Sequence, residues 1–462
     1  MRSRIEKGMD GMAINAPRGT QDVLPADSYK WKFLENLLLE TAALYGFSEI
    51  RTPAFEQMDL FQRGVGDTTD VVQKEMFEVK GQKGTDVFAL KPEGTAGVVR
   101  AALQGGLLND SLPLKACYVT PCFRHERPQA GRLREFHQFG CEVLGPQAPA
   151  ADAELIAMMS HMLKLLEVKG VELNINSIGC KACRGEYHKA LREYFGGHKD
   201  QLCPTCLERL DKNPMRLLDC KNPECAEIGK SAPVVLDYLC DECKEHFEEV
   251  KSRLTAMGIP FRVNPKIVRG LDYYTKTVFE FITTQIGAQG TICGGGRYDG
   301  LVEELGGKPT PALGFAMGLE RMLMVLEAQN TQLPKPRQCD LYIGSMGKEA
   351  NRKAGEITDR LRAEGFYVEY DLMDRSVKAQ MKYANKLGAR MSMILGDNEL
   401  STGKAALKDM ATGEQKEIAF EADLMNLLYD AMLAREADEL AGQIGPDAFQ
   451  RIMGLESGEK KA

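Results

Sequence analysis

A short stretch of this 462-residue chain carries four arginines between two strand-like segments. Guanidinium groups stay charged and offer paired N–H donors, so a cluster of them is typical of a site that binds phosphate or carboxylate groups. Glu126, Gln138 and Glu142 add polar groups to the same stretch. We therefore predict an anion clamp with polar residues behind it, although an exposed, charged hairpin would have the same composition. The arginines are Arg124, Arg127, Arg132 and Arg134.

A long β-hairpin is the element that would position these residues. Strand-like segments at 116–120 and 136–144 flank a turn at 128–131 that contains proline and glycine. Side chains alternate between the two faces of a strand, so Phe136, Gln138, Gly140 and Glu142 should share one face.

The rest of the chain before residue 330 predicts an antiparallel sheet with helices. Helices are expected between only some of the strands, which favours an antiparallel sheet over a doubly wound one. Asp27, Thr95 and Asp152 directly precede three helices, and we expect their side chains to cap the first turns. The predicted strands are 47–56, 87–91, 171–178, 261–268, 277–284 and 290–293, with Gly287 and Ala288 as a turn, and the predicted helices are 28–45, 96–103, 153–166 and part of 311–326.

Composition indicates two or three domains of a globular protein. The chain is 44% apolar and 27% charged, which is ordinary for such proteins. No run approaches the ~18 apolar residues of a membrane span, and the start lacks the apolar core of a signal peptide. We therefore expect a cytoplasmic protein with no membrane partner. The net charge of −7 argues against a general nucleic-acid coat, so any RNA contact would need a local basic patch.

Eight of the thirteen cysteines fall into close pairs within one segment. Thiolates two residues apart can reach the same tetrahedral ion, so we expect structural zinc in a segment that is poor in large apolar residues. Buried free thiols are an alternative, and disulfides are disfavoured in a reducing compartment. Two Cys₄ sites, or one site with a spare set, fit the spacing equally well. The pairs are Cys180 and Cys183, Cys203 and Cys206, Cys220 and Cys225, and Cys240 and Cys243.

A second domain is predicted after a proline-containing linker at 331–336. Strand and helix patterns alternate from residue 340 to 395, which indicates a small α/β domain with a parallel core. Lys378, Lys382 and Lys386 lie four residues apart and should share one helix face. Such a face suits contacts with RNA phosphates, but a solvated lysine face would look the same.

Five motifs together resemble the histidyl-tRNA synthetase family, which belongs to the class II aminoacyl-tRNA synthetases. The resemblance extends from Ala16 to about Glu421. Three motifs are common to the class: the helix at 28–45 with the strand around Pro53, FRHE (123–126) with FHQFGCE (136–142), and GFAMGLER (314–321). Two more are specific to the histidine enzyme: RGLDYY (269–274) and GGRYDGL (295–301).

The resemblance implies an α+β protein: a class II synthetase catalytic domain with an antiparallel sheet, a cysteine-rich inserted domain and a C-terminal α/β anticodon-binding domain. The boundaries that we expect are a disordered extension at 1–14, catalytic parts at 15–178 and 263–330, the insertion at 179–262, the linker at 331–336, the anticodon-binding domain at 337–425, and a C-terminal helix and tail at 426–462. The insertion would serve as a tRNA acceptor-side arm, distant from the chemistry.

The resemblance also implies an activity: ATP-dependent ligation of L-histidine to tRNA(His) through a histidyl-adenylate, with magnesium accompanying ATP. The enzyme would be a homodimer joined through residues 28–56. The catalytic residues would be Arg124 and Arg269. ATP would also meet Glu126, Glu142 and Arg321, with Glu142 facing the nucleotide or its magnesium; histidine would meet Glu93, Gly94, Thr95, Gln138, Glu142, Tyr273, Tyr274 and Tyr298; tRNA would meet Arg127, Gln129, Lys378, Lys382 and Lys386.

Two other functions remain as alternatives at this point. One is a non-catalytic relative, the regulatory subunit of ATP phosphoribosyltransferase, which would sense histidine. Members of that group lack the anticodon-binding domain and the catalytic arginines, whereas this chain has Arg269 and a domain after Arg337. The other is a generic tRNA-binding protein, which would not require Glu93, Arg124 and Arg269 together.

Overall fold

The computed structural model describes residues 14–66, 69–81, 87–286 and 290–444. The chain forms two compact units, the first ending at Pro334 and the second beginning at Lys335. This division falls inside the segment predicted to be a linker. Most of the predicted N-terminal extension, the predicted turn at Gly287 and Ala288, and the tail after residue 444 lie outside the described residues.

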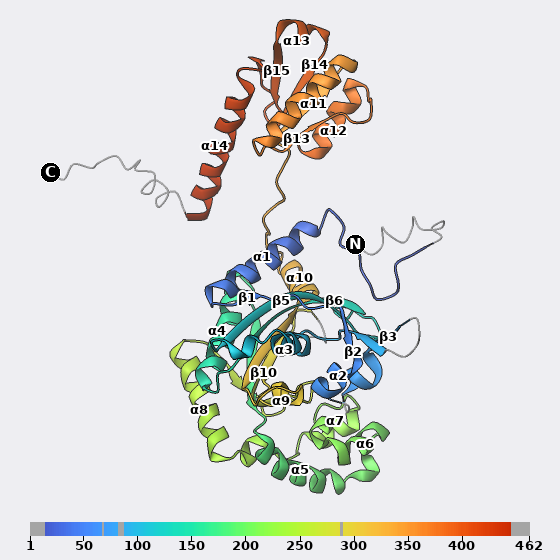
Figure 1. The fold of residues 1–462 in the computed structure, drawn as a ribbon, viewed down its shortest axis with the longest axis vertical. Helices are drawn as coiled ribbons and strands as arrows, with labels where there is room; N and C mark the ends of the chain where they lie inside the picture. Colours follow the sequence, from blue (N-terminus) through green and yellow to red (C-terminus); the bar gives the residue numbers. More distant parts are fainter. Residues whose placement is uncertain (1–13, 67–68, 82–86, 287–289, 445–462) are drawn as a thin grey trace, which may run out of the picture. The chain divides into compact units, whose positions relative to one another are not determined.

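An eight-stranded sheet forms the centre of the first unit (Figure 1). Its order is β1-β5-β6-β11-β10-β9-β7-β8, and neighbouring strands are antiparallel except for the pairs β1/β5 and β7/β8. The predicted antiparallel sheet is therefore confirmed for all strands except the two at its edges. The strands are β1 (Ser48–Glu49), β5 (Leu114–Phe123), β6 (Glu135–Leu144), β7 (Val171–Ser177), β8 (Arg262–Val263), β9 (Thr275–Thr283), β10 (Thr291–Arg297) and β11 (Ala312–Gly318).

The two faces of β6 have different surroundings, as the alternation predicts. Phe139, Cys141 and Val143 belong to the main apolar core on one face. Gln138 and Glu142 point to the opposite face, where Glu142 is opposite Gly314 of β11 in the antiparallel register. The sheet therefore separates an apolar core from a polar site.

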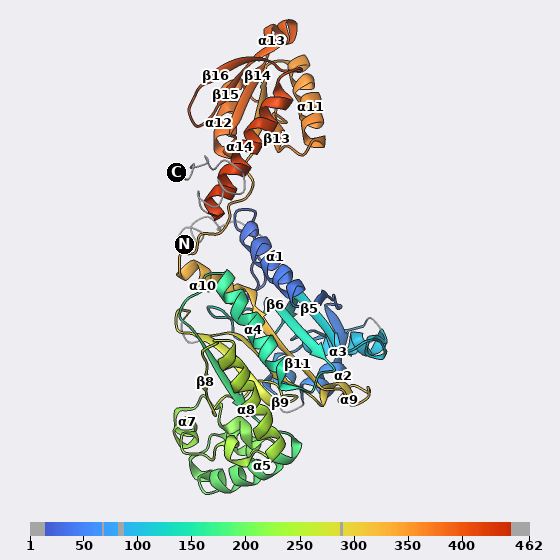
Figure 2. The same ribbon diagram turned by 90° about the vertical axis from the view of Figure 1, so that its left-hand side faces the viewer.

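Helices cover the core face of the sheet. Leu34 and Leu38 of α1 are fully buried there, and burial of a leucine stabilises a fold by roughly 1.5–3 kcal/mol. Figure 2 shows α4 and α8 on one side of the sheet, with α2 and α3 on the other. The helices of this unit outside the insertion are α1 (Ser28–Leu44), α2 (Met58–Val65), α3 (Thr95–Gln104), α4 (Pro149–Leu165), α9 (Leu301–Glu304) and α10 (Leu319–Ala328).

Two predicted strands are shorter than expected. The segment 47–56 forms β1 in the main sheet and, after Pro53, β2 (Phe55–Gln57) in a small sheet with β3 (Phe77–Lys80) and β4 (Val87–Leu90). The segment 261–268 contributes only the two residues of β8. Residues 264–274 form neither helix nor strand, so no β-ladder fixes their position.

The three predicted helix caps are wrong. Asp27 accepts a hydrogen bond from Lys30 Nζ at 2.7 Å instead of from the helix backbone. Asp152 lies inside the first turn of α4 and is buried against Arg297 of β10. Glu93, two residues before Thr95, accepts the backbone N–H groups at the start of α3. Asp27 and Asp152 each bind another side chain instead of the helix backbone, and Glu93 caps α3 in place of Thr95.

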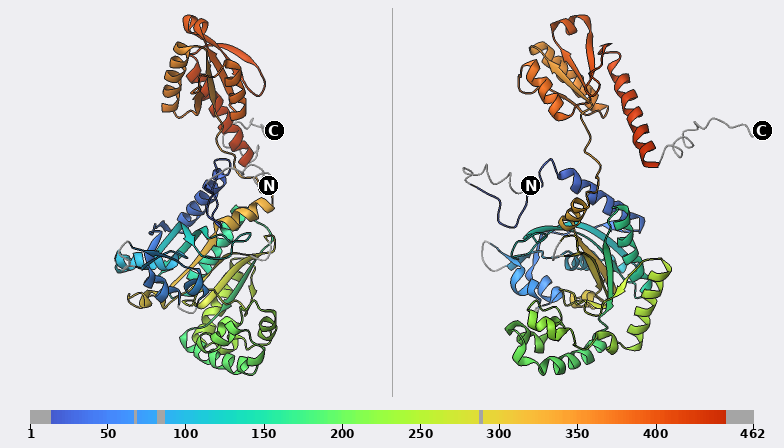
Figure 3. Two further views of the ribbon diagram at one scale, coloured as in Figure 1. Left: turned by 90° about the vertical axis from the view of Figure 1, so that its right-hand side faces the viewer. Right: turned by 180° about the vertical axis from the view of Figure 1, so that it is seen from behind.

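The insertion is a set of short helices packed on the first unit. Figures 1 and 3 show them in green, gathered at one end of this unit. Tyr187, Leu191 and Leu217 share a buried cluster with Tyr273 and with Val278 of β9, so the insertion and the sheet have a common core. The helices are α5 (Lys181–Gly196), α6 (Pro204–Lys212), α7 (Pro223–Gly229) and α8 (Asp241–Ala256), with 3₁₀ turns at Lys199–Gln201, Pro214–Leu217 and Val235–Tyr238.

The second unit has a five-stranded sheet in the order β13-β12-β14-β15-β16. The first three strands are parallel and the last two antiparallel, which confirms the predicted parallel core. The elements are β12 (Leu341–Ser345), α11 (Lys348–Ala363), β13 (Val368–Tyr370), α12 (Val377–Leu387), β14 (Met391–Leu395), α13 (Asp397–Thr402), β15 (Lys404–Asp409), β16 (Gln415–Ala419) and α14 (Leu424–Ile444). Across the described part of the chain, the helices fall short of what crossing a membrane would require in length and apolar content.

Candidate active site and cysteine groups

One cavity in the first unit brings together most of the residues predicted to bind histidine and ATP. It lies on the polar face of the sheet and is closed on one side by the irregular segment 264–274, which we call the wall. Glu93, Thr95 and Gln138 form what we call the floor, and Glu142 lies beneath it. The predicted residues that line the cavity are Glu93, Thr95, Arg124, Glu126, Gln138, Arg269, Tyr273, Tyr274, Tyr298 and Arg321.

Glu93 is fixed by the start of α3. Its two carboxylate oxygens accept the N–H groups of Thr95 and Ala96, each at 2.8 Å. The hydroxyl of Tyr273 lies 3.5 Å from Glu93 Oε2. Burial raises the pKa of Glu93, while the two backbone N–H donors lower it. The carboxylate is therefore held in one orientation with lone pairs still available for a ligand.

Glu142 is fully buried and accepts hydrogen bonds from three hydroxyl groups. Thr95 Oγ1 donates at 2.7 Å and the Tyr118 hydroxyl at 3.0 Å, both to Oε1, and the Tyr298 hydroxyl donates to Oε2. Burial raises the pKa of Glu142 to about 8, in spite of these donors. Glu142 is absent from the cavity lining and supports the floor from below, so its contacts with histidine, ATP or magnesium stay predictions.

Glycines make room for this buried network. A Cβ atom at Gly314 would overlap the carboxylate of Glu142, and one at Gly140 would overlap the ring of Tyr118. Gly94, predicted to contact histidine, also lies against the Tyr118 ring and is buried. The absence of side chains at these positions is therefore what allows the floor to form.

Arg124 and Arg321 occupy the cavity from two different elements. Arg124 Nε donates to the carbonyl of Pro92 at 2.9 Å, and its guanidinium lies 5.3 Å from the Phe136 ring centroid. Arg321 donates to the carbonyls of Gly131 and Thr291. Burial and the nearby Arg132 and Arg124 lower the pKa of Arg321. These guanidinium groups are close enough to repel one another, and an anionic ligand would relieve that repulsion.

Arg269 enters the cavity from the wall. It forms an ion pair with Glu280 of β9 and lies over the ring of Tyr274 at 5.5 Å. Burial lowers the pKa of Arg269, but Tyr274 and Glu280 outweigh it and leave the pKa above its ordinary value. Gly294 of β10 leaves the space that this guanidinium fills. Arg269 is thus permanently charged and held at the cavity by its partners.

The remaining predicted residues lie at the tip of the hairpin, and only some of them line the cavity. Glu126 lines the cavity and pairs with Arg132 at 2.8 Å. Arg134 does not line the cavity: it donates to the carbonyls of Glu126 and Arg18, so its predicted place in the anion clamp is wrong. Arg127 and Gln129 are exposed on the loop, where a large ligand can reach them.

Magnesium is usually bound to proteins by one or two carboxylates together with substrate phosphates. Glu126 lines the cavity and receives no backbone donor among its described contacts, which fits such a shared coordination. The other carboxylates there are occupied, Glu93 by α3 and Glu320 by the backbone N–H of His137. The cavity thus suits magnesium that arrives with a nucleotide.

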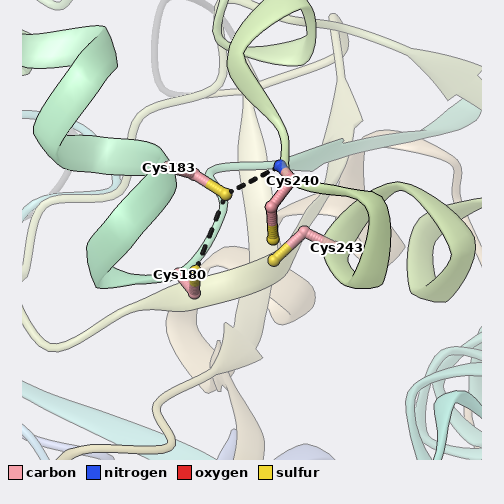
Figure 4. A group of neighbouring side chains, drawn as sticks. All are labelled: Cys180, Cys183, Cys240 and Cys243. Carbon is pink, nitrogen blue, oxygen red and sulfur yellow. Dashed lines mark hydrogen bonds between the residues drawn. The ribbon is translucent and has the colours of Figure 1, made fainter.

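The eight insertion cysteines form two groups of four. One contains Cys180, Cys183, Cys240 and Cys243 (Figure 4), and the other contains Cys203, Cys206, Cys220 and Cys225. Within each group the sulfur atoms all lie within 4.8 Å of one another. The spacing alone left open how the close pairs combine. The structure combines them into two groups of four, and each group joins two close pairs from different parts of the insertion.

The geometry of both groups fits a metal ion better than disulfides. Four sulfurs each about 2.3 Å from zinc in a tetrahedron lie about 3.8 Å apart. The Sγ atoms of Cys180 and Cys183 are 3.6 Å apart, and those of Cys203 and Cys220 are 3.8 Å apart. All thirteen cysteines are free thiols. The backbone N–H groups of Cys240 and Cys203 donate to Cys183 and Cys225 Sγ, which would orient thiolate ligands.

In the second unit, α12 carries the three predicted lysines. Lys378, Lys382 and Lys386 are exposed, as their spacing of four residues predicts. The neighbouring Arg375 lies 4.2 Å from the ring centroid of Tyr383 and pairs with Asp371. The helix therefore presents a basic face to solvent.

Two features of the site were missed from the sequence. Tyr118, an apparent strand residue, supplies a hydroxyl to Glu142. Arg216 and Arg184 of the insertion reach the wall, with Arg216 donating to the carbonyl of Gly270 and Arg184 to that of Tyr274. Arg216 stands between Met215 and Leu217, and an arginine inside an apolar run was the signal that could have revealed it.

An antiparallel sheet bearing an arginine-lined cavity, followed by a separate α/β unit, is the architecture of a class II aminoacyl-tRNA synthetase. The profile described as Histidyl-tRNA synthetase matches residues 19–182 and 217–322, and the profile described as Anticodon binding domain matches residues 340–427. The chain belongs to the histidyl-tRNA synthetase family.

Individual relatives agree with this assignment. The chain is 55% identical over 416 residues to the histidine--tRNA ligase of Clostridium novyi, covering 90% of this chain and 98% of the relative. It is 51% identical over 410 residues to that of Caldanaerobacter subterraneus, covering 89% and 98%. Among solved structures, the apo histidyl-tRNA synthetase of S. aureus matches with a TM-score of 0.77 and 39% identity, covering 90% of this chain and 99% of that one.

Proposed function

We propose that this protein attaches L-histidine to tRNA(His) in two steps, through a histidyl-adenylate formed from ATP. The observation that carries the proposal is the meeting of Arg124, Arg269 and Arg321 with Glu93 and the tyrosines at one cavity. Fixed cations beside a carboxylate that can bind an imidazole are what adenylation of histidine requires.

In the first step, a carboxylate oxygen of histidine attacks the α-phosphorus of ATP, the bond to the β-phosphate breaks, and pyrophosphate leaves. Negative charge accumulates on the phosphate oxygens in the transition state, where Arg124 and Arg269 stabilise it from opposite sides. Arg321 holds the distal phosphates. Magnesium supplies further charge neutralisation when it is bound with the nucleotide.

In the second step, the terminal ribose hydroxyl of tRNA attacks the carbonyl carbon of the adenylate, loses its proton, and AMP leaves. Arg127 and Gln129, exposed at the hairpin tip, contact the acceptor end. Lys378, Lys382 and Lys386 contact phosphates elsewhere on the tRNA. This division lets the two units handle different parts of the same substrate.

Glu93 and Tyr274 bind the two nitrogen atoms of the histidine ring, and Tyr273 and Tyr298 complete the pocket. Thr95 and Gln138 hold the ammonium and carboxylate groups. A site built to hydrogen-bond a substrate rejects analogues that lack these groups by a factor of about 10⁴ or more, because buried partners are left unpaired. No editing domain is then required.

The experiment that tests this function is exchange of labelled pyrophosphate into ATP, followed by charging of tRNA(His). We expect exchange to depend on histidine and to be absent with the other amino acids. Exchange that proceeds with another amino acid, or charging of a different tRNA, contradicts the proposal. Histidine binding without any exchange would instead favour a histidine-sensing regulatory subunit.

The protein acts as a cytoplasmic homodimer joined through the region 28–56. Leu44 and Phe55 are exposed there by 78% and 52%, and large apolar side chains in one region are typical of an interface. The thirteen free thiols suit a reducing compartment. Light scattering tests the dimer: particles of only 51.2 kDa at micromolar concentration contradict it.

The metal in the insertion is structural zinc, one ion in each group of four cysteines. Zinc favours tetrahedral sulfur sites, and its binding energy stabilises small segments that contain little core of their own. We expect two zinc ions per chain in protein purified without chelator or a metal-affinity tag. Fewer than about 0.2 per chain, with eight freely titrating thiols in the insertion, contradicts this assignment.

A further inference from the structure

The wall carries three site residues but has no regular structure of its own. Arg269, Tyr273 and Tyr274 lie in the segment 264–274, which connects β8 to β9 without a helix or a strand. Catalytic groups must be held to within about 0.5 Å of their working positions. Contacts from outside the segment therefore have to supply the rigidity that a β-ladder gives elsewhere.

The insertion supplies such a contact near the start of the RGLDYY sequence. Arg216 is buried, with 7% exposure, and donates to the carbonyl of Gly270, directly after Arg269. Its guanidinium also lies 3.4 Å from Asp272 Oδ1, which accepts a hydrogen bond from Asn213 at 3.0 Å. The turn that contains Arg216 thus binds both the backbone and a side chain of the wall.

A second contact from the insertion reaches the end of the same sequence. Arg184 Nη1 donates to the carbonyl of Tyr274 at 3.2 Å. Burial lowers the pKa of Arg184, with the carboxylates of Asp272 and Glu304 nearby acting in the opposite direction. Arginines of the insertion therefore bind the wall near both ends of the RGLDYY sequence, while Asn176 of β7 binds the carbonyls of Pro265 and Ile267.

Each of these arginines is tied to one group of cysteines. Arg184 follows Cys183 directly on α5. Arg216 stands in the 3₁₀ turn Pro214–Leu217, between α6, which contains Cys206, and Cys220. Cys206 and Cys220 belong to the same group of four, so an ion bound there would close a loop of chain around Arg216.

We infer that the insertion is a positioning device for the adenylation site: metal held by the Cys203, Cys206, Cys220 and Cys225 group fixes Arg216, and Arg216 fixes the wall. This inference rests on the proposed function for its kinetic consequence. It also revises the expectation that the insertion is remote from the chemistry. Arg216 and Arg184 are positioning residues, since neither lines the cavity.

The first experiment compares Arg216→Met with Lys212→Met, an exposed neighbour at the end of α6. We expect the first to lower kcat for pyrophosphate exchange by about 10- to 100-fold, because small displacements of catalytic groups have effects of that size. Histidine KM should change less, and amide hydrogen exchange over 264–274 should accelerate. Lys212→Met should leave all three unchanged.

The substitution Arg216→Lys separates positioning from simple loss of packing. Lysine keeps the charge but cannot reach two acceptors with a planar fork, so we expect only partial recovery of kcat. A kcat for Arg216→Met within about twofold of wild type, with unchanged hydrogen exchange in the wall, overturns the inference.

The second experiment tests the metal. Cys206→Ser should reduce zinc from two ions to one per chain, and hydrogen exchange over 264–274 should rise as in Arg216→Met. Cys339→Ser, which alters a buried thiol in the second unit, is the matched control and should change neither quantity. Loss of one zinc with no change in the wall overturns the link between metal and site.

Hydrogen exchange and metal content do not depend on the reaction. If the wild-type protein shows no histidine-dependent exchange of pyrophosphate into ATP, the proposed function is wrong. The two structural readouts would still decide whether the insertion controls the wall. If pyrophosphate exchange is normal but hydrogen exchange in the wall does not respond to Arg216→Met or Cys206→Ser, the inference alone is wrong.

Discussion

The floor and the wall of the cavity are built in different ways. The floor stands on β6 and the start of α3, where Glu93 and Glu142 receive backbone or hydroxyl donors within a regular framework. The wall is irregular, and side chains from the insertion hold its backbone at Gly270 and Tyr274. The floor therefore depends on the sheet and α3, whereas the wall depends on the insertion as well as on contacts with the sheet. Substitution of Glu93 in the floor and of Arg269 in the wall should accordingly have different effects on histidine binding and on adenylation.

The largest effect is expected from the wall residue Arg269. Arg269→His should lower the adenylation rate by at least about two orders of magnitude while histidine binding stays nearly intact, because Arg269 acts on transition-state charge. Pyrophosphate exchange and equilibrium binding of histidine measure the two quantities.

The ion pair with Glu280 requires a control for this variant. In Arg269→His combined with Glu280→Gln, no partly buried carboxylate loses its guanidinium partner. A rate within about tenfold of wild type for Arg269→His, or full recovery in the double variant, means that Arg269 stabilises the fold rather than the transition state.

A floor substitution should have the opposite signature. Glu93→Gln should raise histidine KM by about 10- to 100-fold and leave ATP KM unchanged, because an amide oxygen replaces a carboxylate that accepts two N–H groups and binds the imidazole. Steady-state kinetics with each substrate varied provide the measurement. Glu78→Gln, on exposed β3, is the control. A raised ATP KM with a normal histidine KM would mean that Glu93 contributes to ATP binding and not to histidine binding.

The lysine face of α12 lies outside both regions and should affect neither. Replacing Lys378, Lys382 and Lys386 together with alanine should lower kcat/KM for tRNA by about tenfold and make its salt dependence shallower, since each lost phosphate contact reduces the slope by about 1. Pyrophosphate exchange should remain normal. Alanine at the exposed Lys335, Lys348 and Lys416, which removes the same number of charges, serves as the matched control. Equal effects in both sets would mean that general charge, and not this face, attracts the tRNA.

The smallest effect concerns stability. Burial raises the pKa of Glu142 to about 8, so the folded protein retains a proton there that the unfolded chain releases near pH 4.5. This stabilising contribution is full below pH 4.5 and is lost as the pH rises toward 8. Glutamine at position 142 cannot ionise, so the Glu142→Gln variant does not lose this contribution. The melting temperature of the variant minus that of the wild type should therefore increase from pH 5 to pH 8. A constant difference across this range would show that Glu142 is already ionised at low pH.

Local pattern predicted the floor well. The alternation of β6 placed Gln138 and Glu142 on one face, and the spacing on α12 placed its lysines together. Both depend on residues close in sequence, where the periods of strand and helix leave little choice.

Tertiary partners explain what the sequence could not provide. Asp152 looks like a helix cap until Arg297, 145 residues away, provides a stronger partner. The cysteine spacing allowed several pairings, and only the fold brings Cys180 close to Cys243. The wall contacts of Arg216 were hidden for the same reason, because no periodicity links residue 216 to residue 270.

The glycines beneath the floor restrict how this site could change under selection. A drug that fills the cavity is usually evaded by a substitution that narrows the pocket or adds bulk beside the ligand. Any side chain at Gly314 or Gly140 would instead collide with Glu142 or Tyr118 and disrupt the network that holds the floor. Resistance should therefore arise elsewhere around the cavity, for example at Gly270, where an added Cβ atom would meet nothing within 4 Å. Sequencing of resistant isolates would show which part of the pocket is free to vary.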